Sequence, residues 1–311
     1  MINENKFSLA EGYSSHVEGS NNIATNYHTH AEGCRTIASN TCAHSEGLQT
    51  EASGTASHAE GSDTKASGDH AHAEGLNTFA SGHYSHAEGR SYSKYNGDLS
   101  ADKILEGWQD IKEKDKRFSM AFGNSSHVEG ENCLALKSGA HAEGSATIAD
   151  YFFAHAEGEL TTANGEAAHA EGYKTAASGM GSHAEGHTTK ASRIASHAEG
   201  YCTIALGDSQ HVQGQYNLLD NGRNAITTSK LGKYAHIVGN GINASHRSNA
   251  YTLDWSGNAW YQGTVESAGI ILTSPNGTKY YISVDDTGTL NVVPAATPKL
   301  EAQEGLNVLS E

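Results

Sequence analysis

The residues with the most obvious chemistry in this sequence are histidines and glutamates that recur at a fixed spacing. Thirteen histidines fall in two series, His16 to His86 and His127 to His211, each with a step of 14 residues. Each is followed two residues later by Glu, except that Gln213 follows His211, and three residues later by Gly. Imidazole and carboxylate groups together can form ion pairs, bind metal ions or transfer protons. Because a catalytic site occurs once rather than thirteen times, the pattern predicts a structural role, with no catalytic residue and no metal site.

The elements that carry these residues follow from the repeat itself. It has two seven-residue halves, x-x-T-x-A-S-G and x-x-S-H-A-E-G, represented by residues 62–68 and 69–75. A fixed period this short predicts an all-β parallel solenoid, in which each half forms a short strand and a glycine corner. Strand alternation places the recurring alanines inside a thin coil and the histidines and glutamates on the opposite side of the second strand.

A coil this thin buries little apolar area, so it needs oligomerisation or another support. The position after Thr varies between rungs, as in Ile37, Glu51 and Lys65, whereas His and Glu hardly vary. We therefore expect a homotrimer whose chains are joined by His–Glu hydrogen bonds or ion pairs. An alternative is a metal ion or anion held on the trimer axis by three imidazoles per level, and no other cofactor is expected. The predicted trimer-interface residues are His58, Glu60, His72, Glu74, His141, Glu143, His155, Glu157, His169, Glu171, His183 and Glu185.

The composition excludes several classes of partner. The 311 residues carry a net charge of -16 with neutral histidines, which argues against a nucleic-acid backbone as partner. No run of about 18 apolar residues occurs, so no membrane insertion is expected. The four cysteines have no metal-binding spacing and are expected to be free thiols, which suggests assembly in a reducing cytoplasm.

Interruptions of the repeat divide the chain. About 20 extra residues follow the first series, with a plausible N-cap at Ser100 and with Ile104, Leu105 and Trp108 on one helical face. After the second series the texture changes to short strands and turns around Ser-Gly-Asn and Pro-Asn-Gly. The predicted parts are repeats in 1–96, a helical insertion in 97–116, repeats in 117–244 with a loop at 215–233, a β-rich domain in 245–293 and a flexible tail in 294–311.

With its Ala-Ser-Gly and Ser-His-Ala-Glu-Gly halves, the repeat resembles the haemagglutinin-type repeats in head domains of trimeric autotransporter adhesins. Its His-Ala-Glu-Gly form is similar to tail-fibre, or receptor-binding, proteins of phages, prophages and phage-tail-like particles. Segments 253–260 and 274–280 also resemble tail-fibre C-terminal sequence. The resemblance implies a left-handed parallel β-roll, a homotrimer, and a place in a virion or tail-like particle beside other tail or baseplate proteins. Adhesin heads usually carry Val and Ile where this chain has His and Glu, so the trimer interior would be polar.

Aromatic side chains are the best candidates for receptor contact, because their faces suit sugar rings and they are favoured at interfaces. The alternative is that they fill the core of the C-terminal domain. We expect a non-enzymatic fibre that attaches to a bacterial surface glycan or protein; a polysaccharide-degrading tail spike and a bacterial surface adhesin are the alternatives. The candidate receptor-binding residues are Tyr92, Tyr95, Trp108, Trp255, Trp260, Tyr261 and Tyr280.

Overall fold

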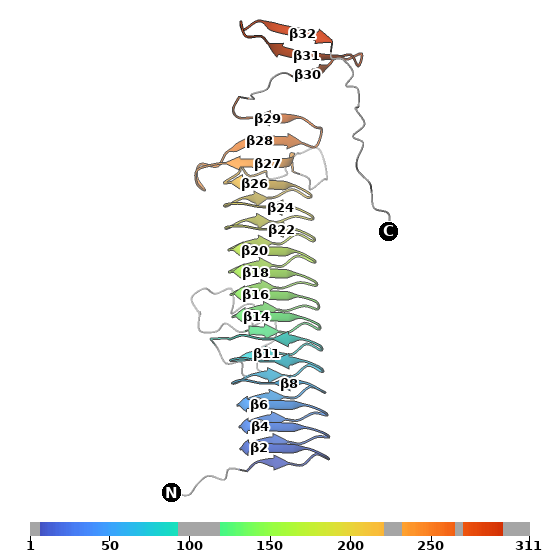
Figure 1. Ribbon diagram of the computed structural model, residues 1–311, viewed down its shortest axis with the longest axis vertical. Coiled ribbons are helices and arrows are strands. Elements are labelled where there is room, and N and C mark those ends of the chain that lie inside the picture. The colour runs from blue at the N-terminus through green and yellow to red at the C-terminus, as the bar shows by residue number, and fades with distance from the viewer. Residues whose placement is uncertain (1–6, 93–118, 221–231, 265–269, 295–311) are drawn as a thin grey trace. The chain divides into compact units, whose positions relative to one another are not determined.

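The chain folds as a parallel β-solenoid built from two sheets, followed by a small antiparallel sheet, as the computed structural model in Figure 1 shows. The structure describes residues 7–92, 119–220, 232–264 and 270–294. Each 14-residue repeat contributes one strand to sheet A and one to sheet B, and consecutive rungs pair in parallel. The described residues are thus all-β, as predicted, and contain no helix.

Sheet A has 13 strands. They are β1 (Leu9–Ala10), β3 (Ile23–Ala24), β5 (Ile37–Ala38), β7 (Glu51–Ala52), β9 (Lys65–Ala66), β11 (Thr78–Ala80), β13 (Ser119–Ala121), β15 (Leu134–Ala135), β17 (Ile148–Ala149), β19 (Thr162–Ala163), β21 (Ala176–Ala177), β23 (Lys190–Ala191) and β25 (Ile204–Ala205).

Sheet B has 16 strands. They are β2 (His16–Ser20), β4 (His30–Cys34), β6 (His44–Leu48), β8 (His58–Ala59), β10 (His72–Ala73), β12 (His86–Ala87), β14 (His127–Glu131), β16 (His141–Ser145), β18 (His155–Glu159), β20 (His169–Tyr173), β22 (His183–Ala184), β24 (His197–Ala198), β26 (His211–Gln215), β27 (Tyr234–Asn240), β28 (Asn249–Asp254) and β29 (Ala259–Tyr261).

The core between the two sheets is made of small side chains. The register aligns equivalent positions, so that His72 pairs with His58 and His86, and Ala73 pairs with Ala59 and Ala87. Ala66 of sheet A and Ala73 of sheet B are both fully buried, as are their equivalents along the stack. The predicted inward placement of the alanine columns is confirmed.

Glycine is required where sheet B turns. Gly61 has a φ of +101°, and a Cβ built on it would lie 2.2 Å from the carbonyl oxygen of Gly75 in the next rung. Two further corner positions take positive φ without being glycine, as in Asp63 and His70, each at +57°. Such a conformation costs about 1–2 kcal/mol for a non-glycine residue. Backbone hydrogen bonds to the preceding rung, such as Asp63 N–H to the Leu48 oxygen at 2.8 Å, hold these corners in place.

Sheet B continues past the last rung of sheet A. Strand β27 pairs in parallel with β26, and β28 and β29 then add in antiparallel order. The chain forms two compact units that meet between Gln262 and Gly263. β28 and β29 belong to the first unit and pair with sheet B of the solenoid, and the predicted domain bounds stay a prediction. The second unit holds a separate antiparallel sheet of β30 (Ile270–Thr273), β31 (Lys279–Val284) and β32 (Leu290–Pro294).

A second apolar cluster lies on the outer side of sheet A, opposite its alanine column. Met120 and Leu134 are fully buried there, and Phe79 and Ile148 nearly so, with Leu136 beside them. The rungs involved flank the insertion. The predicted helix at 97–116 lies outside the described residues, as does the predicted tail beyond Pro294. No helix in the described part of the chain is long and apolar enough to cross a membrane.

Candidate functional site: the His/Glu face

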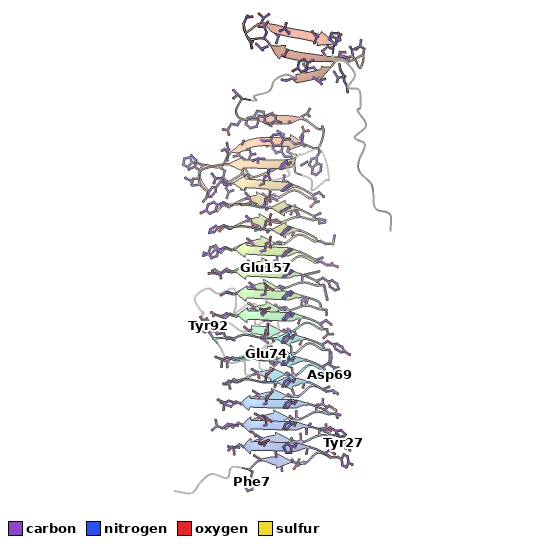
Figure 2. All side chains as sticks on the ribbon, viewed as in Figure 1. Phe7, Tyr27, Asp69, Glu74, Tyr92 and Glu157 are labelled. Atoms are coloured by element: carbon purple, nitrogen blue, oxygen red, sulfur yellow. The ribbon has the colours of Figure 1, made fainter. Side chains whose placement is uncertain are left out.

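The repeated histidines and glutamates share the outer surface of sheet B, which we call the His/Glu face. In Figure 2, Glu74 and Glu157 lie near the middle of the ribbon's width, with Tyr27 and Asp69 at one edge and Tyr92 at the other. The histidine begins each strand and the glutamate follows two residues later, so both side chains leave the sheet on the side away from the alanines. Parallel pairing of identical residues turns each position into a continuous column.

The imidazole rings of this face form one stack. From His30 to His236, each ring lies 4.6–5.0 Å from the next, centroid to centroid, with interplanar angles between 0° and 23°. His236, which the sequence pattern separated from the thirteen because no Glu follows it, is a full member. Tyr251 and Tyr261 then continue the column beyond β27.

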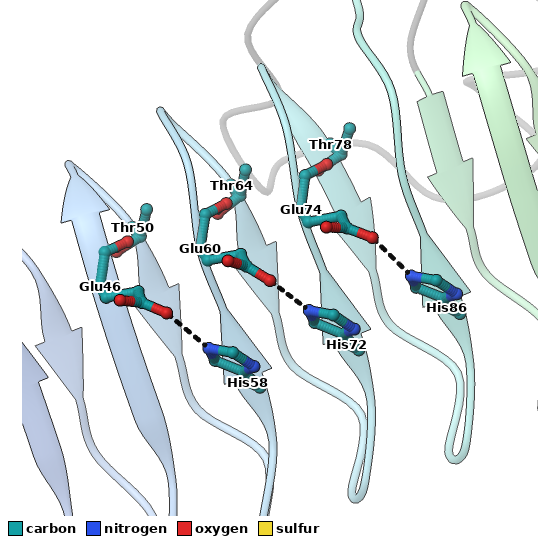
Figure 3. A network of polar contacts seen from close by, with 9 residues as sticks. All are labelled: Glu46, Thr50, His58, Glu60, Thr64, His72, Glu74, Thr78 and His86. Carbon is teal, nitrogen blue, oxygen red and sulfur yellow. Dashed lines mark hydrogen bonds and ion pairs between the residues drawn. The ribbon is translucent and has the colours of Figure 1, made fainter.

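Within one chain, glutamates bond histidines of the following rung. The His72 Nε2 atom lies 3.0 Å from a carboxylate oxygen of Glu60, and the His58–Glu46 and His86–Glu74 pairs are both at 3.3 Å. Figure 3 shows these three contacts side by side, with the next buried threonine behind each glutamate. Three further pairs between rungs, His183–Glu171, His197–Glu185 and His211–Glu199, have nitrogen–oxygen distances of 3.4–3.6 Å. In His30–Glu32, His141–Glu143 and His155–Glu157 both residues belong to one rung, at 3.5–3.6 Å. His–Glu contacts therefore occur within one chain, and pairing between chains stays a prediction.

One chain leaves this face incompletely paired. The side chains of its histidines and glutamates keep about a third of their surface exposed, as in His72 and Glu60, both at 35%. At the same time many of the ring nitrogens are themselves buried and accept or donate no hydrogen bond. An unpaired buried polar atom is costly, so it marks a place where a partner group is expected. The Nε2 atoms of His44, His127, His169 and His236 are in this state. Those of His30, His141, His155, His183, His197 and His211 also make no hydrogen bond, but each lies 3.4–3.6 Å from a carboxylate oxygen.

At some rings of the stack the surroundings favour neutral imidazole. Burial lowers the pKa of His44, His127 and His141, and a neighbouring histidine lowers it further in each case. The adjacent glutamates act in the opposite direction but do not reverse the shift. Among the carboxylates, burial raises the pKa of Glu88, and a hydrogen bond with Glu74 adds to the effect while lowering the pKa of Glu74.

A shallow groove of about 620 Å³ runs along the glutamate column of the later rungs. Its floor is formed where glycines such as Gly186 leave no side chain, and its walls include successive carboxylates. These neighbouring carboxylates repel one another, and a cation or a hydrogen-bond donor in the groove would reduce that repulsion. The lining residues are Glu157, Glu171, Gly172, Glu185, Gly186, Glu199, Gly200, Gln213, Gly214 and Val238.

Metal-ligand groups also recur on this face. In groups such as His58, Glu60 and His72, one donor atom from each residue lies within 4.8 Å of the others. A zinc ion binds imidazole nitrogen at about 2.0–2.1 Å, so two nitrogens on one ion are at most about 4.2 Å apart. The rings of successive histidines stack at 4.6–5.0 Å. The Nε2 atom of a histidine and a carboxylate oxygen of the paired glutamate lie 3.0–3.6 Å apart, so one histidine and one glutamate fit a single ion better than two histidines do.

The aromatic candidates separate into three places. Tyr92 is 62% exposed and lies under the Arg90 guanidinium at 5.6 Å, whereas Tyr95 and Trp108 lie outside the described residues. In the first unit Trp255, Trp260 and Tyr261 are 45%, 54% and 52% exposed. Tyr280 is half-buried in β31 of the second unit. These three candidates of the first unit therefore keep about half of their surface exposed.

Sequence reasoning missed a second ring ladder at the corner after the glycines. Tyr173, His187 and Tyr201 lie in three successive rungs with centroids 4.9 Å and 4.7 Å apart, and Tyr216 meets Tyr201 edge-on at 5.3 Å. The sequence does contain a pattern that indicates this ladder. The residue four places after the repeated His is Tyr173, His187 or Tyr201 in these three rungs, and Ser, Cys, Leu, Arg or Glu in the earlier rungs.

No protein-family model matches this chain, and no curated protein is significantly similar to it. The repeat and the geometry of the His/Glu face are therefore the features that point to a function.

Proposed function

We propose that the chain is a structural and receptor-binding fibre protein of a phage or phage-tail-like particle, and that it acts as a homotrimer of left-handed β-rolls. Its partners would be two further copies of itself, other tail or baseplate proteins and a receptor on a bacterial surface. It would be assembled in the bacterial cytoplasm and act outside the cell, as part of the particle. The role proposed is attachment and not catalysis.

The observation that carries this proposal is the His/Glu face. A column of partly exposed histidines and glutamates extends along the solenoid from His30 to His236, and several of its buried imidazole nitrogens make no hydrogen bond. A receptor would contact a limited patch, whereas a second copy of the same solenoid can contact every rung in register. Identical chains around an axis would bring hydrogen-bonding groups to the unpaired nitrogens at each level. The resemblance of the repeat to trimeric fibre heads supports three copies.

The trimer can be tested by sedimentation equilibrium. The expected mass is three times the 32.7 kDa of one chain. Replacing Glu171 and Glu185 by Lys should yield smaller species, because positively charged lysines of neighbouring chains would then face each other at the interface. Lys190→Glu is the matched control, since Lys190 is an exposed charge on sheet A. If the Glu171→Lys/Glu185→Lys variant and the Lys190→Glu control both remain trimeric, and circular dichroism shows intact β-structure, the His/Glu face is not the interface.

Attachment is tested by pull-down of the full chain on intact bacterial cells. The fibre role predicts saturable binding, and deletion of residues 97–116 or of 263–311 would locate the binding region. Absence of saturable binding on every strain of a broad panel would contradict the attachment role while leaving the trimer unaffected.

A polysaccharide-degrading spike is the second candidate, and the groove of carboxylates is the observation that favours it. Glycoside hydrolysis uses a pair of carboxylates on either side of the scissile bond. Here the carboxylates Glu157, Glu171, Glu185 and Glu199 repeat along the groove, and no pair is distinguished from the rest by its position. Release of reducing ends from purified surface polysaccharide would favour the spike, and would be lost in the Glu171→Gln/Glu185→Gln variant.

A further inference from the structure

A hollow opens at the end of the solenoid, where sheet A stops and sheet B continues. The core-side column of sheet B runs from Val212 through Ile237 to Thr252 and then to Trp260, since these residues are paired across β26 to β29. Val212, Ile237 and Thr252 are buried, but Trp260 is 54% exposed. An indole at a core-side position with half of its surface open is not explained by packing of the solenoid.

The hollow beside Trp260 has a volume of about 410 Å³. It falls in the range of pockets that hold small ligands, which are about 300–1,000 Å³. The polar groups around the indole are Asp254, Asn258 and Lys233, with Tyr234 and the buried Thr252 at the back. The hollow thus combines an aromatic face with several hydrogen-bonding groups, which suits a ligand that has both an apolar face and polar groups.

The polar groups are held in place by the turn between β28 and β29. One oxygen of the Asp254 carboxylate accepts the backbone N–H groups of Ser256 and Asn258 at 2.9 Å and 2.8 Å. The other accepts the Asn258 side-chain amide at 2.9 Å. A carboxylate has about four acceptor sites, so one remains for a ligand, and the Asn258 amide oxygen adds another acceptor. Lys233 adds a cationic donor above the Tyr234 ring.

We propose that this hollow binds a neutral pyranose of a bacterial surface glycan. The C–H face of the sugar ring would lie on Trp260, and its hydroxyl groups would bond Asp254, Asn258 and Lys233. One acid and one base line the hollow, and the whole chain carries a net charge of -16, so an anionic polymer would be repelled. The assignment rests on the proposed function, in which a surface glycan is the receptor.

The location is compatible with a trimer. Trp260 lies on the core side of sheet B, whereas its neighbour Tyr261 lies on the His/Glu face, where it contacts Tyr251 at 4.9 Å. A second copy packed on the His/Glu face therefore leaves the hollow open.

The test is a calorimetric titration of the full chain with tetrasaccharides of glucose, galactose and N-acetylglucosamine, and with tetragalacturonate as the anionic comparison. At least one neutral probe should bind, and Trp260→Ala should weaken it at least about tenfold, with Trp260→Phe in between. Tyr27→Ala is the control, because Tyr27 is an aromatic residue with 58% exposure that does not line the hollow, and the affinity of this variant should stay within about threefold of the parent value.

The proposal is overturned if no neutral probe binds, if tetragalacturonate binds as tightly, or if Tyr27→Ala and Trp260→Ala weaken binding equally. The pull-down on cells separates the two proposals. Binding of Trp260→Ala to cells at the parent level means that the glycan site is wrong and the fibre role stands. Sugar binding by a parent chain that attaches to no cell means that the glycan site stands and the fibre role fails.

Discussion

At the scale of single residues, the repeat is a set of steric and hydrogen-bonding requirements. The threonine column illustrates the second kind, because its hydroxyl groups are buried in every described rung that carries one but are not used alike. Thr64 Oγ1 donates to the Glu60 carbonyl at 3.0 Å, and the Thr50 and Thr78 hydroxyls make the same bond. The Thr189 hydroxyl is buried without a hydrogen-bond partner. Residues that look identical in the sequence therefore contribute differently.

Replacing Thr64 and Thr189 by valine should show how much each threonine hydroxyl contributes to stability. Thr64→Val loses a buried hydrogen bond and should lower the free energy of unfolding by about 1 kcal/mol. Thr189→Val removes a hydroxyl that has no partner and should leave stability unchanged or raise it, within about 0.5 kcal/mol. Urea unfolding followed by circular dichroism measures both. Equal losses in the two variants would show that the hydroxyl contacts do not differ.

The glycine column gives a steric test. A Cβ on Gly158, which has a φ of +101°, would lie 2.2 Å from the Gly172 carbonyl oxygen, so Gly158→Ala should cost more than about 2 kcal/mol, through strain at positive φ and displaced backbone. Gly181→Ala is the control, because nothing lies within 4 Å of its Cβ and Ala56 and Ala195 occupy the same corner in other rungs. The control should melt within about 2 °C of the parent, and a matching fall in both melting temperatures would contradict the steric account.

At the scale of elements, the period of the sequence specifies the fold and the exceptions to it specify local features. The 14-residue step and the alternation of Thr, Ala, His and Glu were sufficient to predict two sheets, an alanine core and an outward His/Glu face, since each depends only on strand parity. Parity could not reveal which glutamate meets which histidine, because that depends on the stagger between rungs. The extent of sheet B could not be predicted either, because β28 and β29 join it by antiparallel pairing outside the repeat.

The outer apolar cluster of sheet A is such a local exception. Leu134 occupies the position after the buried threonine slot and is fully buried, while Lys190 occupies the equivalent position of a later rung and is exposed. Leu134→Ala should lower the free energy of unfolding by about 2–5 kcal/mol, as for a fully buried leucine. Lys190→Ala should change it by less than about 0.5 kcal/mol. A small effect of Leu134→Ala in thermal unfolding would mean that the cluster does not contribute to the fold.

At the scale of the whole molecule, stacking makes the titration of the histidines a collective property. Each imidazole has another imidazole on both sides and carboxylates beside it, so protonation of one ring raises the cost of protonating the next. Burial comes first among the causes that lower the pKa of His44, His127, His141 and His236. At these four histidines the folded state thus binds fewer protons than the unfolded chain below about pH 6.5.

The sign of the resulting pH dependence follows from this difference. The unfolded histidines titrate near pH 6.5, and the shifted ones titrate lower when folded, so their stabilisation is complete above about pH 6.5 and is lost as the pH falls through the folded pKa values. Urea midpoints should fall between pH 7 and 5. His141→Gln should flatten the fall, because the group is removed, whereas Glu143→Gln should steepen it, because this carboxylate raises the pKa of His141. A His141→Gln variant with a steeper fall than the parent would instead indicate that charged His–Glu pairs, and not neutral stacked rings, stabilise the shaft.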